Sequence, residues 1–336
     1  MSIPSFELTR ATSVADACAL LADPECATEV IAGGTQLLIT LKNGTHAPQR
    51  LVDIGAIAGL AEIRSSPEGL SIGAGVTLAR LADHPEVARR HQVLAEAAKA
   101  VGTLQLRSMG TVAGNLCQDS CCIYVDRTIE QRHSLAPCHK INGDHCHIVP
   151  TSGSCWANYA GDLAPALIAL DASVSVASVA GTEVRPITSL FSFEGTRPIA
   201  LGAGELITDI RVPAPNGRAG GMYLKLRQRG SLDYPLLGVA AAVTLEEDGT
   251  CRTARVALTG VDRGPVLVPE ADRLRGHIIG DELLEEIAHA AYKRARPVKN
   301  TFGYGASYRV RMAKPFVIRA LRGAAARAEG REVLHG

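Results

Sequence analysis

Cysteines are unevenly placed along the 336-residue chain, and six of the nine fall in one segment, namely Cys117, Cys121, Cys122, Cys138, Cys146 and Cys155. A reducing compartment makes structural disulfides improbable, so clustered cysteines favour metal binding or catalysis. The last four follow one another at intervals too irregular for the short C-x₂₋₄-C steps of zinc knuckles. Four thiolates that converge suit a [4Fe–4S] cluster, in which each iron accepts one sulfur. Zinc, helped by nearby histidines, is the alternative, because sulfur-only tetrahedral sites bind both metals.

Two glycine-rich segments have the composition of loops that hold phosphate groups. One is Ala32-Gly33-Gly34-Thr35-Gln36, between a strand and a helix-like run, and the other is Thr111-Val112-Ala113-Gly114-Asn115. Glycine lets the backbone approach a ligand and point N–H groups at an anion, and Thr or Asn side chains add donors. Neither segment is a G-x-G-x-x-G or a G-x-x-x-x-G-K-[ST] motif, so the sequence does not support a Rossmann or P-loop site. For either segment taken alone, an ordinary tight turn is the favoured interpretation.

The chain shows no motif for transforming an organic substrate by itself. It has neither a G-x-S-x-G nor an H-E-x-x-H motif, and no other evident pairing of a nucleophile with a base. We therefore expect bound groups to supply the chemistry of this chain and expect the substrate to react elsewhere.

Short strands alternate with helices in the N-terminal half, and these elements must position the two glycine segments. Ser13 and Asp16 have the spacing of a capping box before an apolar helical face. The chain from Thr77 to about Val101 is helical in character, with a break near Pro85. Strands bounded by turn residues are predicted at Glu29–Ala32, Leu51–Ile54 and Leu70–Gly75.

A polar, cysteine-rich stretch from about Asp119 to Trp156 has neither the helical nor the strand period. So long a stretch without structure is unusual in a compact domain unless something orders it, and a metal can do so. A Pro/Gly stretch between Ile210 and Arg218 is the best candidate for a domain boundary. Further elements are predicted as helices at Asp162–Leu170, Asp281–Arg294 and Ser307–Ala326, and as strands at Ser173–Ala177, Gly238–Leu245 and Cys251–Gly260.

Composition excludes several classes of protein. The apolar fraction is 46% and the charged fraction 21%, as in globular proteins, and the length suggests about two domains. The 35 basic and 34 acidic side chains give a net charge of +1, so no basic field would attract nucleic acid. No apolar run approaches the roughly 20 residues that a bilayer-spanning helix needs. The first residues lack the pattern of a signal peptide, and we therefore expect a cytoplasmic protein without membrane contacts.

The two glycine segments, in this order and at this spacing, resemble the FAD-pyrophosphate loops of the molybdenum hydroxylase flavoproteins. These include the medium subunits of carbon monoxide dehydrogenase, the flavin domain of xanthine dehydrogenase and the β subunit of 4-hydroxybenzoyl-CoA reductase. Gln36 and Ala113 depart modestly from the residues common at these places in the family. The resemblance covers nearly the whole chain and also includes Tyr159–Leu167, Gly204–Pro213, Tyr223–Arg227 and Tyr308–Met312.

This resemblance implies a mixed α/β and α+β fold. A two-part FAD-binding domain of the vanillyl-alcohol oxidase type would occupy residues 1–217, with parts at about 1–55 and 56–217. A smaller α+β domain would follow at residues 218–336, and the iron–sulfur insertion would span about 119–157. FAD would lie extended between the two domains.

The same resemblance implies which residues contact FAD. The glycine loops would hold the pyrophosphate, Asp162 would bond the flavin or its ribityl chain, and Lys225 would approach the isoalloxazine. Tyr234 would place its ring against the flavin, although a core or interface ring is an equal alternative. The expected FAD contacts are Ala32, Gly33, Gly34, Thr35, Gln36, Thr111, Gly114, Asn115, Gln118, Asp162, Ile207, Lys225 and Tyr234.

The cysteine insertion resembles that of the 4-hydroxybenzoyl-CoA reductase β subunit, with matching cysteine intervals. This implies a [4Fe–4S] cluster held by Cys122, Cys138, Cys146 and Cys155, with Cys121 as an alternative to Cys122. The resemblance implies no catalytic residue in this chain.

Partner subunits also follow from the resemblance. A molybdopterin-binding large subunit and a small [2Fe–2S] subunit would complete the complex, as a dimer of heterotrimers. In the 4-hydroxybenzoyl-CoA reductase type, reduced ferredoxin supplies electrons that pass inward through the extra cluster and FAD to molybdenum, for reductive removal of a phenolic hydroxyl. The alternatives are a xanthine-dehydrogenase-like hydroxylase subunit acting on another aromatic or heterocycle, and a zinc-stabilised scaffold without flavin.

Overall fold

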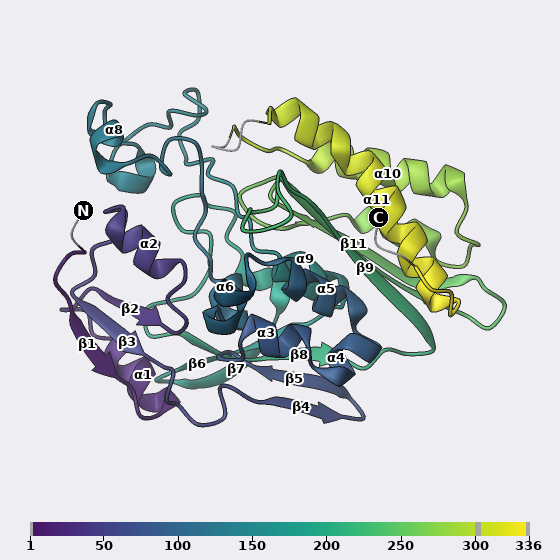
Figure 1. Cartoon of the computed structure of the whole chain (residues 1–336), viewed down its shortest axis with the longest axis horizontal. Coiled ribbons are helices and arrows are strands. Elements are labelled where there is room, and N and C mark those ends of the chain that lie inside the picture. Colours follow the sequence, from purple (N-terminus) through teal and green to yellow (C-terminus); the bar gives the residue numbers. More distant parts are fainter. Residues whose placement is uncertain (1–2, 300–303, 334–336) are drawn as a thin grey trace.

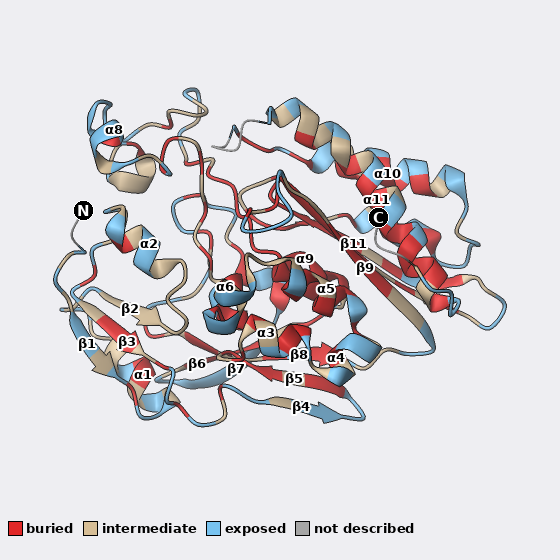
Figure 2. Cartoon of the chain, viewed as in Figure 1, coloured by how far each residue is buried: buried red, intermediate tan, exposed pale blue. Residues whose placement is uncertain are grey.

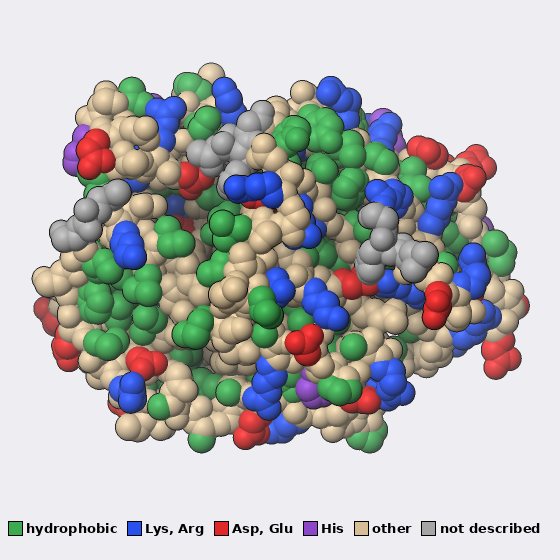
Figure 3. Space-filling model, viewed as in Figure 1, with side chains coloured by type: hydrophobic (Ala, Val, Ile, Leu, Met, Phe, Trp, Pro, Cys, Tyr) green, Lys and Arg blue, Asp and Glu red, His purple; other side chains and the backbone are tan. Residues whose placement is uncertain are grey.

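The computed structural model describes residues 3–299 and 304–333. These residues form three β-sheets, and helices pack beside the sheets, as Figure 1 shows. On the face drawn in Figure 3, basic and acidic side chains are interspersed, in agreement with the near-zero net charge. Within the described residues, no helix combines the length and the apolar character that crossing a membrane requires.

The first sheet is a small parallel one in the order β1-β3-β2. Ser13 begins its first helix as predicted, because its side chain accepts a hydrogen bond from the Asp16 backbone N–H. Only half of the expected capping box forms, since the Asp16 carboxylate accepts from the Thr12 backbone N–H instead. The elements are β1 (Glu7–Arg10), α1 (Val14–Leu21), β2 (Thr28–Ile31), α2 (Leu37–Lys42) and β3 (Arg50–Asp53).

The second sheet is antiparallel, in the order β4-β5-β8-β6-β7. Some of its strands precede the cysteine insertion in the sequence and others follow it, so the insertion interrupts one folded unit. The strands are β4 (Ile63–Ser66), β5 (Gly69–Gly73), β6 (Ser173–Ser178), β7 (Gly181–Pro186) and β8 (Leu206–Pro213).

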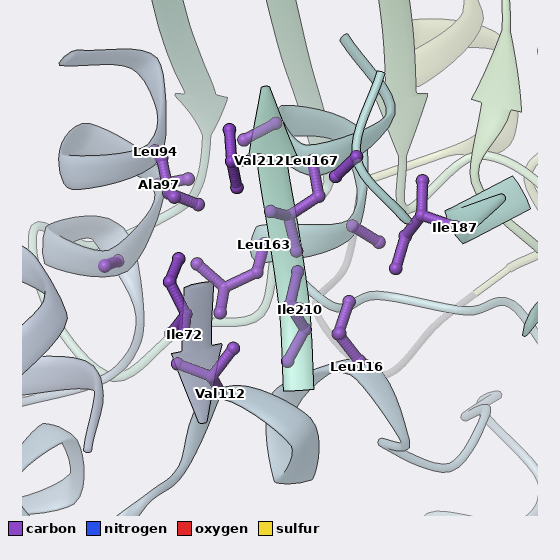
Figure 4. Packing of buried hydrophobic residues seen from close by; sticks show 14 of the residues in the cluster. Ile72, Leu94, Ala97, Val112, Leu116, Leu163, Leu167, Ile187, Ile210 and Val212 are labelled. Carbon is purple, nitrogen blue, oxygen red and sulfur yellow. The ribbon is translucent and has the colours of Figure 1, made fainter. Parts of the chain in front are cut away.

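Helices of this second unit build the largest core. The predicted break near Pro85 is confirmed, because Pro85 occupies the first turn of a new helix. Leu163 and Leu167 lie in one buried cluster with Ile72, Leu94 and Ile210, as seen in Figure 4. The helices are α3 (Leu78–Ala82), α4 (Pro85–Arg90), α5 (Gln92–Ala100), α6 (Leu104–Met109), α7 (Val112–Leu116), α9 (Leu163–Ala169) and the 3₁₀ helix η2 (Ile187–Leu190).

The cysteine insertion between α7 and α9 is largely irregular, as its lack of hydrophobic period predicts. Two short helices do form there, α8 (Ile129–His133) and the 3₁₀ helix η1 (His139–Ile141). A capping box between Thr128 and Gln131 begins α8, a local signal that the sequence prediction missed. In Figure 1 the insertion stands beside α2, and Arg132 donates to the Asn43 carbonyl at the end of that helix.

The C-terminal sheet is an antiparallel meander in the order β12-β11-β10-β9. Both of its faces are covered: α11 packs on one, with α10 packed against α11, and α5 and α9 pack on the other. Figure 2 shows buried residues on all four helices. Along β10, Val239 and Ala241 therefore face one core and Ala240 the other. The elements are β9 (Arg218–Leu226), β10 (Leu237–Leu245), β11 (Cys251–Thr259), β12 (Val266–Leu267), η3 (Pro269–Leu274), α10 (Asp281–Arg294) and α11 (Ala306–Ala328).

Candidate functional site

The first predicted glycine loop joins β2 to α2 and meets the backbone directly before the second predicted segment. That second segment is largely helical rather than a loop, because Thr111 is the N-cap of α7 and Val112, Ala113, Gly114 and Asn115 lie within this helix. The second loop below means the turn at Gly110 and Thr111 with the first turn of α7. A Cβ added at Gly33 would lie 2.0 Å from the Met109 carbonyl oxygen and 3.0 Å from the Gly110 Cα. Gly34 has φ +66°, a conformation that glycine adopts most readily. These glycines therefore permit a close approach that larger residues would prevent.

Local hydrogen bonds fix the second loop. The Thr111 side chain accepts from the Gly114 backbone N–H at 3.1 Å, and the Gly110 carbonyl accepts from the Leu78 backbone N–H at 2.9 Å. The Asn115 Oδ1 accepts from the Leu163 backbone N–H at 3.0 Å, which ties α7 to the start of α9. The buried core around α9 thereby holds the loop in place.

A cavity of about 620 Å³ opens beside the two loops and reaches residues of β8 and of the segment before β10. Lys225 is the one expected FAD contact that does not line it. The residues that do line it are Ala32, Gly33, Gly34, Thr35, Gln36, Thr111, Gly114, Asn115, Gln118, Asp162, Ile207 and Tyr234.

Lys225 reaches the cavity wall only through Asp162. The Lys225 Nζ lies 3.0 Å from Asp162 Oδ2, and these side chains are only 4% and 5% exposed. The Tyr223 hydroxyl donates to the other carboxylate oxygen at 2.6 Å, and Lys225 also donates to the Ala100 carbonyl at 2.9 Å. Burial raises the pKa of Asp162 above its ordinary value, and the ammonium of Lys225 opposes that rise.

The cavity suits a dinucleotide that carries phosphate groups. Its glycine loops give close backbone access, and its lining combines apolar residues with a few polar groups. The Gln118 Nε2 is buried and has no hydrogen-bond partner among the described residues, although buried donors are rarely left unpaired. A bound ligand with acceptor oxygens would satisfy this amide.

A second, much smaller cavity lies in the insertion, and the four predicted cluster ligands line it. Cys122, Cys138, Cys146 and Cys155 are each 6% exposed. Cys121 does not line this cavity, and Cys117 lines the larger one instead.

Backbone N–H groups point at three of these sulfurs. Val125 donates to Cys122 Sγ at 3.4 Å, Val149 to Cys146 Sγ at 3.4 Å, and Ala157 to Cys155 Sγ at 3.5 Å. Burial raises the pKa of the Cys122 thiol to about 12, so a thiolate there requires a nearby cation.

Three histidines line the cysteine cavity together with the four cysteines. His139, His145 and His147 line it, and the His139 Nε2 is buried with no hydrogen-bond partner in the described part of the chain. His145 and His147 lie against each other, with their Nε2 atoms 3.1 Å apart. Among residues 3–299 and 304–333, no group of three or more His, Cys, Asp or Glu side chains has the arrangement that holds a metal ion.

Comparison with known proteins identifies the family. The family described as "FAD binding domain in molybdopterin dehydrogenase" matches residues 4–215, which is more than half of the chain. The chain belongs to this family. The domain described as "CO dehydrogenase flavoprotein C-terminal domain" matches residues 222–324.

Curated relatives match over most of their length. The chain is 30% identical to the 6-hydroxypseudooxynicotine dehydrogenase complex subunit alpha of Paenarthrobacter nicotinovorans, over 98% of this chain and 97% of that protein. It is 35% identical to the aldehyde oxidoreductase FAD-binding subunit PaoB of Escherichia coli, over 80% of this chain and 85% of that protein.

A solved structure of carbon monoxide dehydrogenase from Hydrogenophaga pseudoflava matches with a TM-score of 0.80 and 28% identity, over 97% of this chain and 99% of that one. The expected fold, an FAD-binding domain followed by a smaller α+β domain, is confirmed. The chain is thus an FAD-binding subunit of the molybdenum hydroxylase family. None of these relatives is a 4-hydroxybenzoyl-CoA reductase, so that narrower assignment stays a prediction.

Gly33→Ala tests whether the contact between the loops supports FAD binding. The added Cβ must push the loops apart, and overpacking of this kind costs about 1–3 kcal/mol. We expect FAD to bind about 5- to 150-fold more weakly in equilibrium dialysis, as that cost implies. Gly153→Ala is the matched control, because a Cβ there meets nothing within 4 Å. Unchanged FAD affinity in Gly33→Ala would contradict this account of the loops.

Lys225→Met tests the buried ion pair beside the cavity. Removing the ammonium leaves the Asp162 carboxylate buried without its cation, which typically costs about 3–5 kcal/mol of unfolding free energy. Adding Asp162→Asn removes the stranded charge, so the double variant should recover much of this loss in urea unfolding. If the double variant is as unstable as the sum of the two single variants, the pair does not interact as described.

Proposed function

We propose that this chain is the electron-transfer subunit of a molybdenum-containing oxidoreductase and holds a [4Fe–4S] cluster in addition to FAD. FAD would occupy the larger cavity, and the cluster would be held by Cys122, Cys138, Cys146 and Cys155. The observation that carries the proposal is that these four buried thiols, spread over 34 residues of irregular chain, line one small cavity. A segment with so little secondary structure needs an ordering centre, and a metal group supplies one.

The donor set favours a cluster over a single zinc ion. A Zn–S bond is about 2.3 Å long, so thiolates around one ion lie within about 4 Å of one another. In a four-iron cluster each thiolate binds a different iron, so the sulfurs stand farther apart around a shared centre. The four cysteines line one cavity, which is the arrangement that a shared centre needs. Backbone N–H groups aimed at the sulfurs also suit a cluster, whose potential such bonds tune.

We infer that this chain transfers electrons and that a partner subunit transforms the substrate. Bound flavin exchanges electrons either singly or in pairs, whereas iron–sulfur clusters pass them singly. The chain's own residues would bind, orient and shield FAD. The glycine loops give FAD access to the backbone, and the Asp162–Lys225 ion pair places fixed charges beside the cavity. Substrate chemistry would belong to a molybdopterin-binding large subunit, reached through a small [2Fe–2S] subunit, in a dimer of heterotrimers. The relatives named as FAD-binding subunits or medium chains of larger enzymes support this arrangement.

The cysteine insertion also favours a direction of electron flow. We propose ferredoxin as the donor and reductive removal of a phenolic hydroxyl from an aromatic CoA thioester as the reaction, as in 4-hydroxybenzoyl-CoA reductases. The support is the match of the cysteine intervals to the insertion of that β subunit.

A second candidate is a hydroxylase or dehydrogenase that sends electrons outward from another aromatic or heterocyclic substrate. Its support comes from relatives whose names state such activities. The nicotine 6-hydroxylase medium subunit of Paenarthrobacter nicotinovorans is 28% identical over 97% of this chain.

Anaerobic reduction of the purified complex separates the two candidates. We expect reduced ferredoxin to bleach the flavin absorbance and to drive dehydroxylation of 4-hydroxybenzoyl-CoA, whereas NADH does neither. Cys146→Ala should abolish reduction by ferredoxin yet still bind FAD when FAD is supplied in excess, because Cys146 lines only the cysteine cavity. NADH-driven dehydroxylation would overturn ferredoxin as the donor. Flavin reduced by an aromatic substrate in the absence of ferredoxin would favour the hydroxylase. A colourless chain containing zinc would favour a scaffold.

A further inference from the structure

Asp119 and Lys140 form an ion pair between the two cavities. Asp119 lines the larger cavity, Lys140 lines the cysteine cavity, and the Lys140 Nζ lies 2.7 Å from Asp119 Oδ1. The Lys140 side chain is only 5% exposed. It also donates to the Ser120 Oγ at 2.7 Å and to the Gly195 carbonyl at 2.9 Å. Three acceptors therefore fix the position of this ammonium.

Two further charged side chains, His46 and Glu29, extend this ion pair along the wall of the larger cavity. His46 Nε2 lies 3.3 Å from Asp119 Oδ2, and His46 Nδ1 lies 2.7 Å from Glu29 Oε1. Hydrogen bonds to Asp119 and Glu29 raise the pKa of His46 to about 9, so the imidazole is charged at neutral pH. Burial alone would raise the pKa of Asp119, but His46 and Lys140 bring it below its ordinary value. Glu29, His46, Asp119 and Lys140 thus form a row of alternating charges, here called the charge row.

The backbone of Asp119 also binds the first glycine loop. The Asp119 backbone N–H donates to Gln36 Oε1 at 2.8 Å, and Gln36 Nε2 donates to the Asp119 carbonyl at 3.4 Å. Gln36 is the N-cap residue of α2. The position of Asp119 is therefore linked both to the cysteine insertion and to the loop beside the phosphate-binding cavity.

Loss of the group in the cysteine cavity would act on the other cavity through these contacts. Lys140 lies between Cys138 and Cys146, in the segment that the proposed cluster would order. If that segment loosens, Asp119 loses its nearest cation, and Glu29, His46 and Asp119 carry one net negative charge at the wall of a cavity that must accept a diphosphate. Like charges placed together in a partly buried site repel strongly, so FAD would bind less tightly.

We propose that the charge row couples the filling of the cysteine cavity to FAD binding in the larger cavity. This inference rests on the function proposed above. Because coupling between sites is reciprocal, bound FAD also favours retention of the group in the cysteine cavity. Asp119 and Lys140 act as positioning residues in this scheme and touch no substrate.

The test measures the FAD dissociation constant of the full chain by equilibrium dialysis under anaerobic conditions. One sample is reconstituted with iron and sulfide, and the other is kept free of iron. Coupling free energies between protein sites typically correspond to about 5- to 150-fold changes in affinity, and we expect the iron-loaded chain to bind FAD more tightly within that range. In Asp119→Asn and in Lys140→Met, the ratio of the two dissociation constants should fall close to one. Lys42→Met, an exposed cation on α2, is the matched control and should keep the wild-type ratio.

The outcomes separate this inference from the function on which it rests. Equal FAD affinity in the iron-loaded and iron-free wild-type chain overturns the coupling and leaves both cofactors in place. A wild-type ratio in both variants likewise overturns the role of the charge row. A chain that takes up FAD but no iron overturns the proposed cluster, and the coupling with it. The comparison of wild-type samples requires no substitution, so a variant that fails to fold does not prevent the test.

Discussion

The close approach of Gly33 to the backbone of Met109 and Gly110 is the contact on which the rest of the site depends. It joins a loop of the small parallel sheet to a loop of the second sheet's helical layer, and the larger cavity opens beside this junction. The second loop is in turn held by the core around α9, through the bond from Leu163 to Asn115. A ligand that spans both loops would bind between the layers of two different sheets, and that is how a protein without a Rossmann or P-loop motif can build a dinucleotide site.

The cysteine insertion shows a different way of ordering a chain. Its few buried apolar residues gather around the cysteines themselves, and Arg132 compensates in part by donating to the carbonyls of Val125 and Asn43. Such a segment has little hydrophobic stabilisation of its own, so its conformation is tied to its contacts with α2 and to whatever group the thiols bind. The Asp119–Lys140 ion pair links the insertion directly to the wall of the larger cavity.

The elements that the sequence predicted best are those with strong local signals. The bounds of α10 agree with the predicted Asp281–Arg294 helix, because its apolar period is uninterrupted and Gly280 precedes it. The charge row was missed, since it joins residues that are far apart in the sequence and share no spacing rule. Lys225 was assigned to the flavin by resemblance, yet its partner is Asp162, a contact across the domains that no local pattern encodes. The domain boundary at residue 217, the individual FAD contacts and the cluster ligands stay predictions.

We propose that one chain holds a flavin and an iron–sulfur cluster in neighbouring cavities. The most direct measurement is the FAD, iron and sulfide content of the anaerobically isolated full chain, combined with electron paramagnetic resonance after reduction. We expect one FAD and about four irons per chain, with the cluster signal and the iron lost in Cys138→Ala, which should still bind FAD supplied in excess. A full complement of FAD with zinc, or with no metal, at these cysteines would contradict it.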